Sequence, residues 1–236
     1  MVRPATSAEP LIAPALLRRS VRTETAPGGN AWLRKGFRPF FALAAAYGAL
    51  IIPLWLLILN GLVRVPGLRD PLLWHAHEML FGYTTAVVAG FLLTAVGRWS
   101  GKETAVGGPL LALAVLWLLG RVAMLSPFVP LGLAALLDAA FLPALAFAVG
   151  RPLILARNRR NYGILGVILL LALANVGTHL DAFGVGGWAR QSYLFALDLM
   201  VLLMVVVGAR VIPMFTRNAL GDSSVRSDVL WDRAAL

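Results

Sequence analysis

The sequence predicts an all-α protein that crosses a lipid bilayer several times. Apolar residues occupy 59% of its 236 positions, charged residues only 14%, and the mean hydropathy is +0.80. Soluble domains carry about 25% charged residues, and a water-soluble fold of this composition would have too few polar side chains to cover its surface. Lipid is the solvent that accepts this much exposed hydrocarbon. A polytopic transmembrane helix bundle is therefore expected, and a soluble enzyme is excluded.

Six apolar segments are each long enough to cross about 30 Å of hydrocarbon at about 1.5 Å per residue. Turn and breaker signals rich in Gly and Pro separate them. The predicted spans are residues 38–62, 72–98, 107–126, 128–150, 162–184 and 187–214. They form one six-helix domain over residues 36–220. Residues 1–35 are predicted to be a disordered cytoplasmic tail, and residues 221–236 a cytoplasmic tail or a truncated linker.

The distribution of basic residues predicts the orientation of the bundle. Of the 21 Lys and Arg residues, 17 lie in the N-terminal tail, in the loops after the second and fourth spans, and after the sixth span. By the positive-inside rule, both termini are cytoplasmic. The net charge of +10 comes from short clusters between apolar runs, which is typical of topology signals facing anionic lipid and argues against nucleic-acid binding. Cysteine is absent, so any metal must be held by His, Met, carboxylate or Tyr.

All three histidines fall near the outer edge of the predicted bundle. His75 and His77 lie in the first turns of the second span, and His179 lies roughly 7–8 Å from the outer end of the fifth. Residues two apart on a helix point about 200° away from each other, so His75 and His77 are not expected to bind one ion without local unwinding. Imidazole is a common ligand of haem, copper and zinc. The alternative is that these are interfacial histidines, hydrated by headgroup water and packed beside Trp74.

Two carboxylates are expected much deeper than the histidines. Asp138 lies near the middle of the fourth span and Asp198 near the middle of the sixth. Each costs about 3 kcal/mol at the bilayer centre, so each is expected to face the bundle interior with a partner. They fit a proton path or a polar floor under a cofactor. Equally, they fit structural hydrogen bonds, for example to Asn175 or Thr178.

One cation near the outer end of the third span, Arg121, also has more than one interpretation. It is placed to neutralise Glu78, or an anionic cofactor group such as a haem propionate. Snorkelling of its long side chain to the lipid headgroups explains it as well.

Several strings are recognisable together, in order along the chain. They are GFRPFF at 36–41, WHAHEMLFG at 74–82, AGFLLTAV at 89–96, LLGR at 118–121, the segment 175–180, and RVIPMFTRN at 210–218. In order and placement this resembles the NnrS family of bacterial inner-membrane proteins. The resemblance implies a protein that contains haem b and copper and is linked to nitric oxide metabolism or tolerance of nitrosative stress in denitrifying and related bacteria. It makes His75, His77 and His179 the candidate metal ligands, with Glu78 and Arg121 as supporting cofactor-binding groups.

Family members are generally longer, and this chain resembles their N-terminal half. The expected partners are therefore the lipid bilayer, nitric oxide as a ligand, and either a second copy of the chain or the missing C-terminal half. The alternative function is a small-solute or metal-ion transporter or channel that uses the midplane residues Asp138 and Asp198, with the outer histidines as a capture site.

Overall fold

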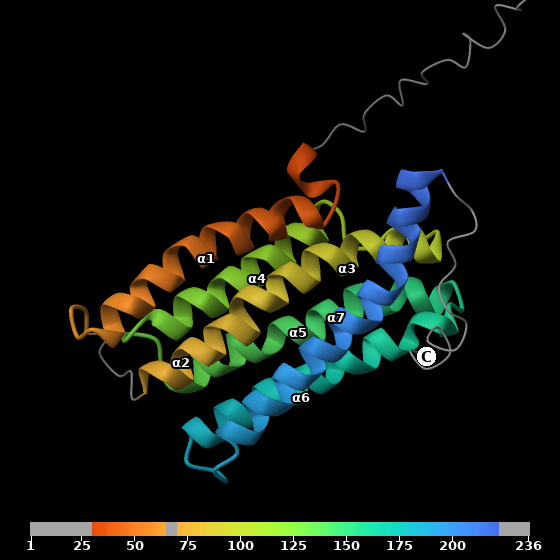
Figure 1. The fold of residues 1–236 in the computed structure, drawn as a ribbon. Coiled ribbons are helices and arrows are strands. Elements are labelled where there is room, and N and C mark those ends of the chain that lie inside the picture. The colour runs from red at the N-terminus through yellow and green to blue at the C-terminus, as the bar shows by residue number, and fades with distance from the viewer. Residues whose placement is uncertain (1–29, 65–69, 222–236) are drawn as a thin grey trace, which may run out of the picture.

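The computed structural model describes residues 30–64 and 70–221, and their ordered elements are all helical (Figure 1). The short 3-10 helices are η2 (Ala31–Leu33) and η4 (Arg159–Asn161), and the longer elements are α1 (Phe37–Leu59), α2 (Pro71–His77), the π-helix η3 (Glu78–Thr84), α3 (Thr85–Ser100), α4 (Gly108–Leu125), α5 (Leu131–Leu155), α6 (Tyr162–Ala182) and α7 (Ala189–Leu220). Within the described residues there is no strand. The predicted all-α class is confirmed.

Six helices of the described chain are long and apolar enough to cross a membrane, as predicted. The second of them, Pro71–Ser100, consists of α2, η3 and α3 end to end. Helix α5 extends beyond its predicted end because it continues through Pro152 to Leu155, and α7, which contains Pro213, continues past residue 214 to Leu220. A proline removes only one backbone donor from a helix, and in a bundle the freed carbonyl finds other partners.

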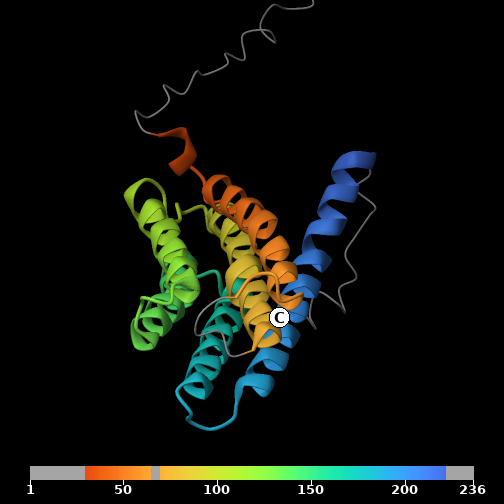
Figure 2. The same cartoon turned by 90° about the vertical axis from the view of Figure 1, so that its left-hand side faces the viewer.

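The second and fourth spans occupy the centre of the bundle. Helix α3 packs against both α1 and α5, while α5 also contacts α4 and α6, and α7 lies along α6 at the edge (Figure 2). The most apolar window of the second span is 50% buried, whereas that of α7 is only 22% buried. The outward faces carry large apolar side chains, among them Leu50, Phe147 and Met204, which are exposed to the surrounding medium. This is the surface expected of a protein solvated by lipid.

Small residues let the central helices approach closely. Ala86 is fully buried, and a Cβ at Gly90 would lie 2.7 Å from Cδ1 of Phe41 in α1. A Cβ at Gly82 would lie 3.0 Å from Nη1 of Arg121. The Gly82–Ala86–Gly90 face, in which small residues recur every four positions, is therefore filled by protein side chains.

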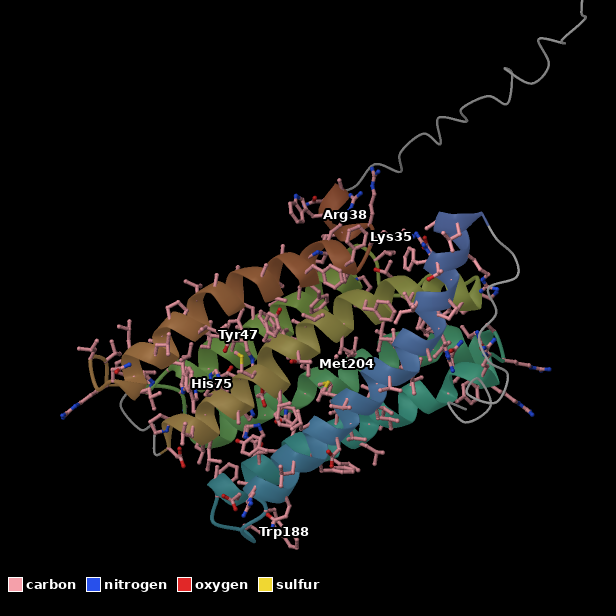
Figure 3. The ribbon with its side chains drawn as sticks, in the orientation of Figure 1. Lys35, Arg38, Tyr47, His75, Trp188 and Met204 are labelled. Atoms are coloured by element: carbon pink, nitrogen blue, oxygen red, sulfur yellow. The ribbon has the colours of Figure 1, made fainter. Side chains whose placement is uncertain are left out.

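The two ends of the bundle differ in the loops they carry. We call the outer end the one at which α1 connects to α2, α4 to α5, and α6 to α7, where Trp188 lies, and Lys35 and Arg38 lie at the opposite, inner end (Figure 3). Helix α1 begins and α7 ends at the inner end (Figure 1). Most of the two predicted tails, 1–35 and 221–236, lies outside the described residues.

Candidate metal site at the outer end of the bundle

The site begins where the second span changes from α-helix to π-helix. Asp70 caps α2 by accepting hydrogen bonds from the backbone N–H groups of Leu72 and Leu73 at 2.8 and 3.2 Å, and Pro71 occupies the first turn. The helix then widens at Glu78, because π-helical hydrogen bonds close five residues back instead of four. Along this segment the consecutive residues His77 and Glu78 are both buried.

Side chains from neighbouring turns and from α4 hold the π-helix in place. Thr84 Oγ1 donates to the carbonyl of Met79 at 2.7 Å, and Thr85 Oγ1 donates to that of Phe81 at 2.5 Å. Trp117 of α4 donates its indole N–H to the Gly82 carbonyl at 3.1 Å. These donors bind backbone carbonyls of the π-helix. The carbonyls therefore have hydrogen-bond partners although the segment is buried.

His75 faces a different part of the bundle from His77. Its ring stacks on Trp55 of α1, with ring centroids 3.9 Å apart and planes 16° apart. Its Nδ1 and the Trp55 Nε1 are buried and have no hydrogen-bond partner within the described part of the chain. Figure 3 places His75 toward the outer end, on the α1 side. The two histidines therefore have separate surroundings, as helix geometry predicted.

Three ligand-bearing side chains from three helices converge instead on one point. His77 Nε2 lies 3.3 Å and His179 Nε2 lies 2.7 Å from the same oxygen, Oδ2 of Asp138. The three candidate ligand atoms lie within 4.8 Å of one another, and all three residues are buried. Two imidazoles and a carboxylate form a donor set that divalent and transition metals accept. This group is able to hold a metal ion.

Arg121 joins this cluster to Glu78. Its Nη1 donates to Glu78 Oε2 at 2.7 Å, and its Nη2 contacts Asp138 Oδ1. Arg121 is only 3% exposed, so it does not snorkel to the headgroups. One guanidinium balances one of the two carboxylates. When both imidazoles are neutral, as metal binding requires, the cluster keeps one uncompensated negative charge that favours a bound cation.

A second layer of hydrogen bonds orients the ligands. Asn175 donates its side-chain N–H to Asp138 Oδ2 at 2.8 Å, which confirms one of the partners expected for that carboxylate. His77 Nδ1 lies 3.4 Å from Glu78 Oε1, and Tyr47 of α1 donates its hydroxyl proton to Glu78 Oε2. A carboxylate behind a ligating imidazole fixes the ring orientation and tautomer. Glu78 lies beside Nδ1 of His77, while Nε2 of the same ring faces Asp138 and lies 3.1 Å from Asn175 Oδ1.

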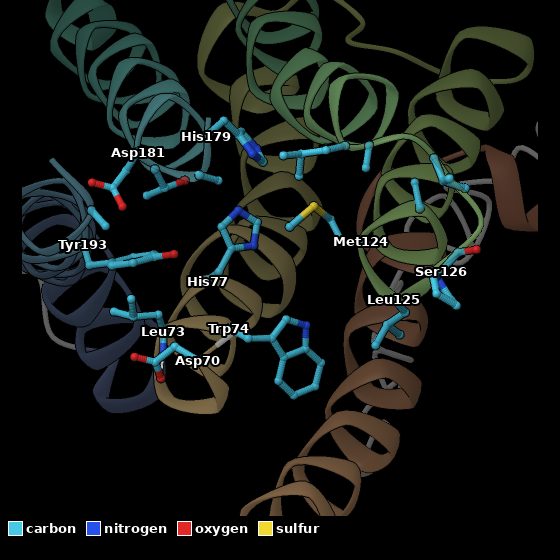
Figure 4. Close-up of a pocket in the computed structure, with 18 residues that line it drawn as sticks. Asp70, Leu73, Trp74, His77, Met124, Leu125, Ser126, His179, Asp181 and Tyr193 are labelled. Atoms are coloured by element: carbon cyan, nitrogen blue, oxygen red, sulfur yellow. Dashed lines mark hydrogen bonds between the residues drawn. The ribbon is translucent and has the colours of Figure 1, made fainter. Parts of the chain in front are cut away.

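A pocket leads from the outer end of the bundle to the histidines (Figure 4). Its volume is about 550 Å³, within the range typical of small-ligand sites. His77 and His179 lie inside it, and the side chain of Met124 extends toward His77 (Figure 4). Asp70 and Asp181 lie at the helix ends that frame it, and His75 is absent from its lining.

The positions expected for Asp138 and Asp198 need correction, the first in its depth and the second in the direction it faces. Asp138 lies about two turns into α5, level with the histidines rather than below them. Asp198 was expected to face the bundle interior, but it is exposed on α7, the edge helix whose outward side has no protein neighbour among the described residues. The sequence made His75, His77 and His179 the candidate metal ligands; the structure brings His77 and His179 together with Asp138, which was not among those candidates, and leaves His75 apart. Met124, which lines the same pocket, was not among them either.

Comparison with known proteins supports the resemblance found in the sequence. The family model described as NnrS protein matches residues 31–236. The chain belongs to the NnrS family. No curated protein and no solved structure matches it. In this NnrS-family chain three residues of the string at 74–82 have different surroundings: His75 packs on α1, His77 joins the cluster with Asp138 and His179, and Glu78 binds the arginine of the LLGR string.

Proposed function

We propose that this multi-pass protein resides in the bacterial inner membrane and binds copper through His77, Asp138 and His179. In this proposal the copper site faces the periplasmic side and serves nitric oxide metabolism or tolerance of nitrosative stress. The observation that carries the metal part is the convergence of three ligand atoms within 4.8 Å, in a buried cluster with one excess negative charge. The link to nitric oxide rests on membership of the NnrS family.

The protein's own residues account for binding, orientation and access. His77 and His179 supply neutral imidazoles, and Asp138 supplies a charged oxygen held by Asn175. The pocket gives a small molecule such as nitric oxide a route from the outer end to the ligand atoms. Copper held by these residues would supply one-electron chemistry.

Haem b fits the described residues less well than copper does. His75, the one candidate histidine outside the cluster, is stacked on Trp55 and does not line the pocket. Arg121, the candidate partner of a propionate, is already engaged by Glu78 and Asp138. Haem b therefore remains an expectation from the family resemblance.

The transporter alternative loses both of its expected interior midplane groups. It requires Asp138 and Asp198 to face a common interior path, yet Asp138 belongs to the cluster at the outer end and Asp198 is exposed on α7.

The test is metal and haem analysis of the purified protein, grown with copper and a haem precursor. We expect close to one bound copper in the wild type, and a loss of copper in His77→Ala, His179→Ala and Asp138→Ala. The matched control is His75→Ala, which removes an imidazole three positions from Glu78 on the same span without touching the cluster and is expected to retain copper. Wild-type protein without copper, or a His75→Ala variant that alone loses it, would overturn the proposed site. A Soret band in the visible spectrum reports haem independently.

A further inference from the structure

The pocket contains one sulfur atom, and its position has a bearing on which ion the cluster takes. Met124 lies three residues after Arg121 near the end of α4, so the two side chains share one face of that helix. Arg121 contacts Asp138 of the cluster, and the side chain of Met124, which lines the pocket, extends toward His77 (Figure 4).

We infer that the cluster is a site for monovalent copper, Cu⁺, and that Met124 supplies its thioether sulfur as a further ligand. The inference rests on the proposed function, since it assigns the oxidation state and an additional donor to the same site. Two independent features carry it, the chemistry of the donor atoms and the charge of the cluster.

The donor atoms favour copper once the sulfur is included. Two imidazoles and a carboxylate alone are equally typical of zinc and of non-haem iron. A thioether is a soft ligand that selects Cu⁺. The chain has no cysteine, and Met124 is the single sulfur-bearing residue among those lining the pocket. Its unbranched side chain has three rotatable bonds, so the sulfur is able to move toward an ion without a shift of the backbone.

The charge of the cluster favours a monovalent ion. Arg121 carries one positive charge, and Glu78 and Asp138 carry two negative charges, in a setting where all three side chains are almost fully buried. A single positive charge makes the cluster neutral. A divalent ion would leave a net positive charge inside the bundle, and an uncompensated buried charge is costly. The charge balance of the cluster and the soft sulfur donor therefore both favour Cu⁺.

The experiment measures Cu⁺ and Zn²⁺ affinities of the full chain in detergent, by competition with a Cu⁺ chelator under anaerobic reducing conditions and with a Zn²⁺-binding dye. The test variant is Met124→Leu, which conserves side-chain volume. The control is Met79→Leu, a methionine of the π-helix that does not line the pocket. We expect Met124→Leu to weaken Cu⁺ binding by on the order of tenfold or more with Zn²⁺ binding unchanged, and Met79→Leu to change neither.

X-ray absorption at the copper edge gives a readout that a merely structural role for Met124 would not move. We expect a sulfur neighbour of copper in the wild type and in Met79→Leu, and its absence in Met124→Leu. Wild-type protein with bound Cu⁺ but no sulfur neighbour overturns this inference and leaves the proposed copper site standing, and so does a Met124→Leu variant that keeps full Cu⁺ affinity. Wild-type protein that binds no copper overturns both.

Discussion

Replacement of Arg121 by Met tests whether the site is held together by its buried charges. Arg121 contacts Glu78 and Asp138 at once, and the three side chains are at most 3% exposed. Charges about 4 Å apart attract by about 4 kcal/mol at an effective dielectric constant of about 20. The orphaned carboxylates take up protons or water, so the net loss is smaller than both attractions together. We expect about 3–5 kcal/mol of destabilisation, the usual cost of breaking a buried ion pair from one side.

A second substitution separates charge from packing. The cluster carries one excess negative charge in the wild type and two in Arg121→Met, while Arg121→Met combined with Glu78→Gln returns it to one. The double variant is therefore expected to be more stable than Arg121→Met alone. The coupling between the two positions is expected to fall within about 0.5–3 kcal/mol, as for other residues in direct contact.

Reversible unfolding in mixed micelles of mild detergent and dodecyl sulfate measures these free energies, with tryptophan fluorescence as the signal. Arg190→Met is the control, because Arg190 is exposed at the start of α7. An Arg121→Met variant as stable as the Arg190→Met control would refute the reasoning. A double variant destabilised by the sum of the two single effects would show that charge balance contributes nothing.

Three further substitutions probe the surroundings of the site. Gly82→Ala places a Cβ 3.0 Å from the Arg121 guanidinium and is expected to cost about 1–3 kcal/mol in the same unfolding assay; Gly132→Ala, which meets open space, is the control and is expected to be neutral or stabilising. Trp117→Phe removes the indole donor while Thr85 still donates to the Gly82 carbonyl, so it is expected to cost about 0.5–1.5 kcal/mol, the net value of one hydrogen bond; equal stability with the wild type would mean that the π-helix does not need this bond. Asp198→Asn is expected to leave the bound copper per chain unchanged in metal analysis, because Asp198 is exposed on α7; loss of copper would place this residue in the site after all.

The membrane class and the spans were predictable because they depend on averages over many residues. The high apolar content indicated a protein surrounded by lipid, and helix-breaking residues such as those between residues 126 and 131 indicated the turns. The π-helix was not predictable in the same way. Its segment Glu78–Thr84 has no proline, and its hydrogen-bond register depends on donors such as Trp117, which is 35 residues away from the carbonyl it binds. Local sequence does not contain that information.

The site was predicted in part, and the errors have specific causes. The separation of His75 from His77 followed from helix geometry alone. The depth of Asp138 was wrong because the predicted span, 128–150, begins earlier and ends earlier than the helix Leu131–Leu155, which moves this residue from the middle toward the outer end. The direction of Asp198 was wrong because the cost of a charge in lipid indicates that a partner is needed, whereas only packing reveals which helix lies at the edge.

The π-helix η3 also divides the second span into two halves, and the rotation of each half about the helix axis is determined by different contacts. Below it, α3 is aligned by its contacts with α1 and α5, and above it α2 is aligned by the capping Asp70 and by the cluster around His77. A π-helical turn is equivalent to a residue inserted into an α-helix. A single helical-wheel projection of residues 71–100 therefore assigns the wrong buried face to one of the two halves. Deletion of one residue in Glu78–Thr84 would rotate α2 by about 100° relative to α3. The ligand-bearing turn would then face away from α5 and α6, although no ligand had been replaced.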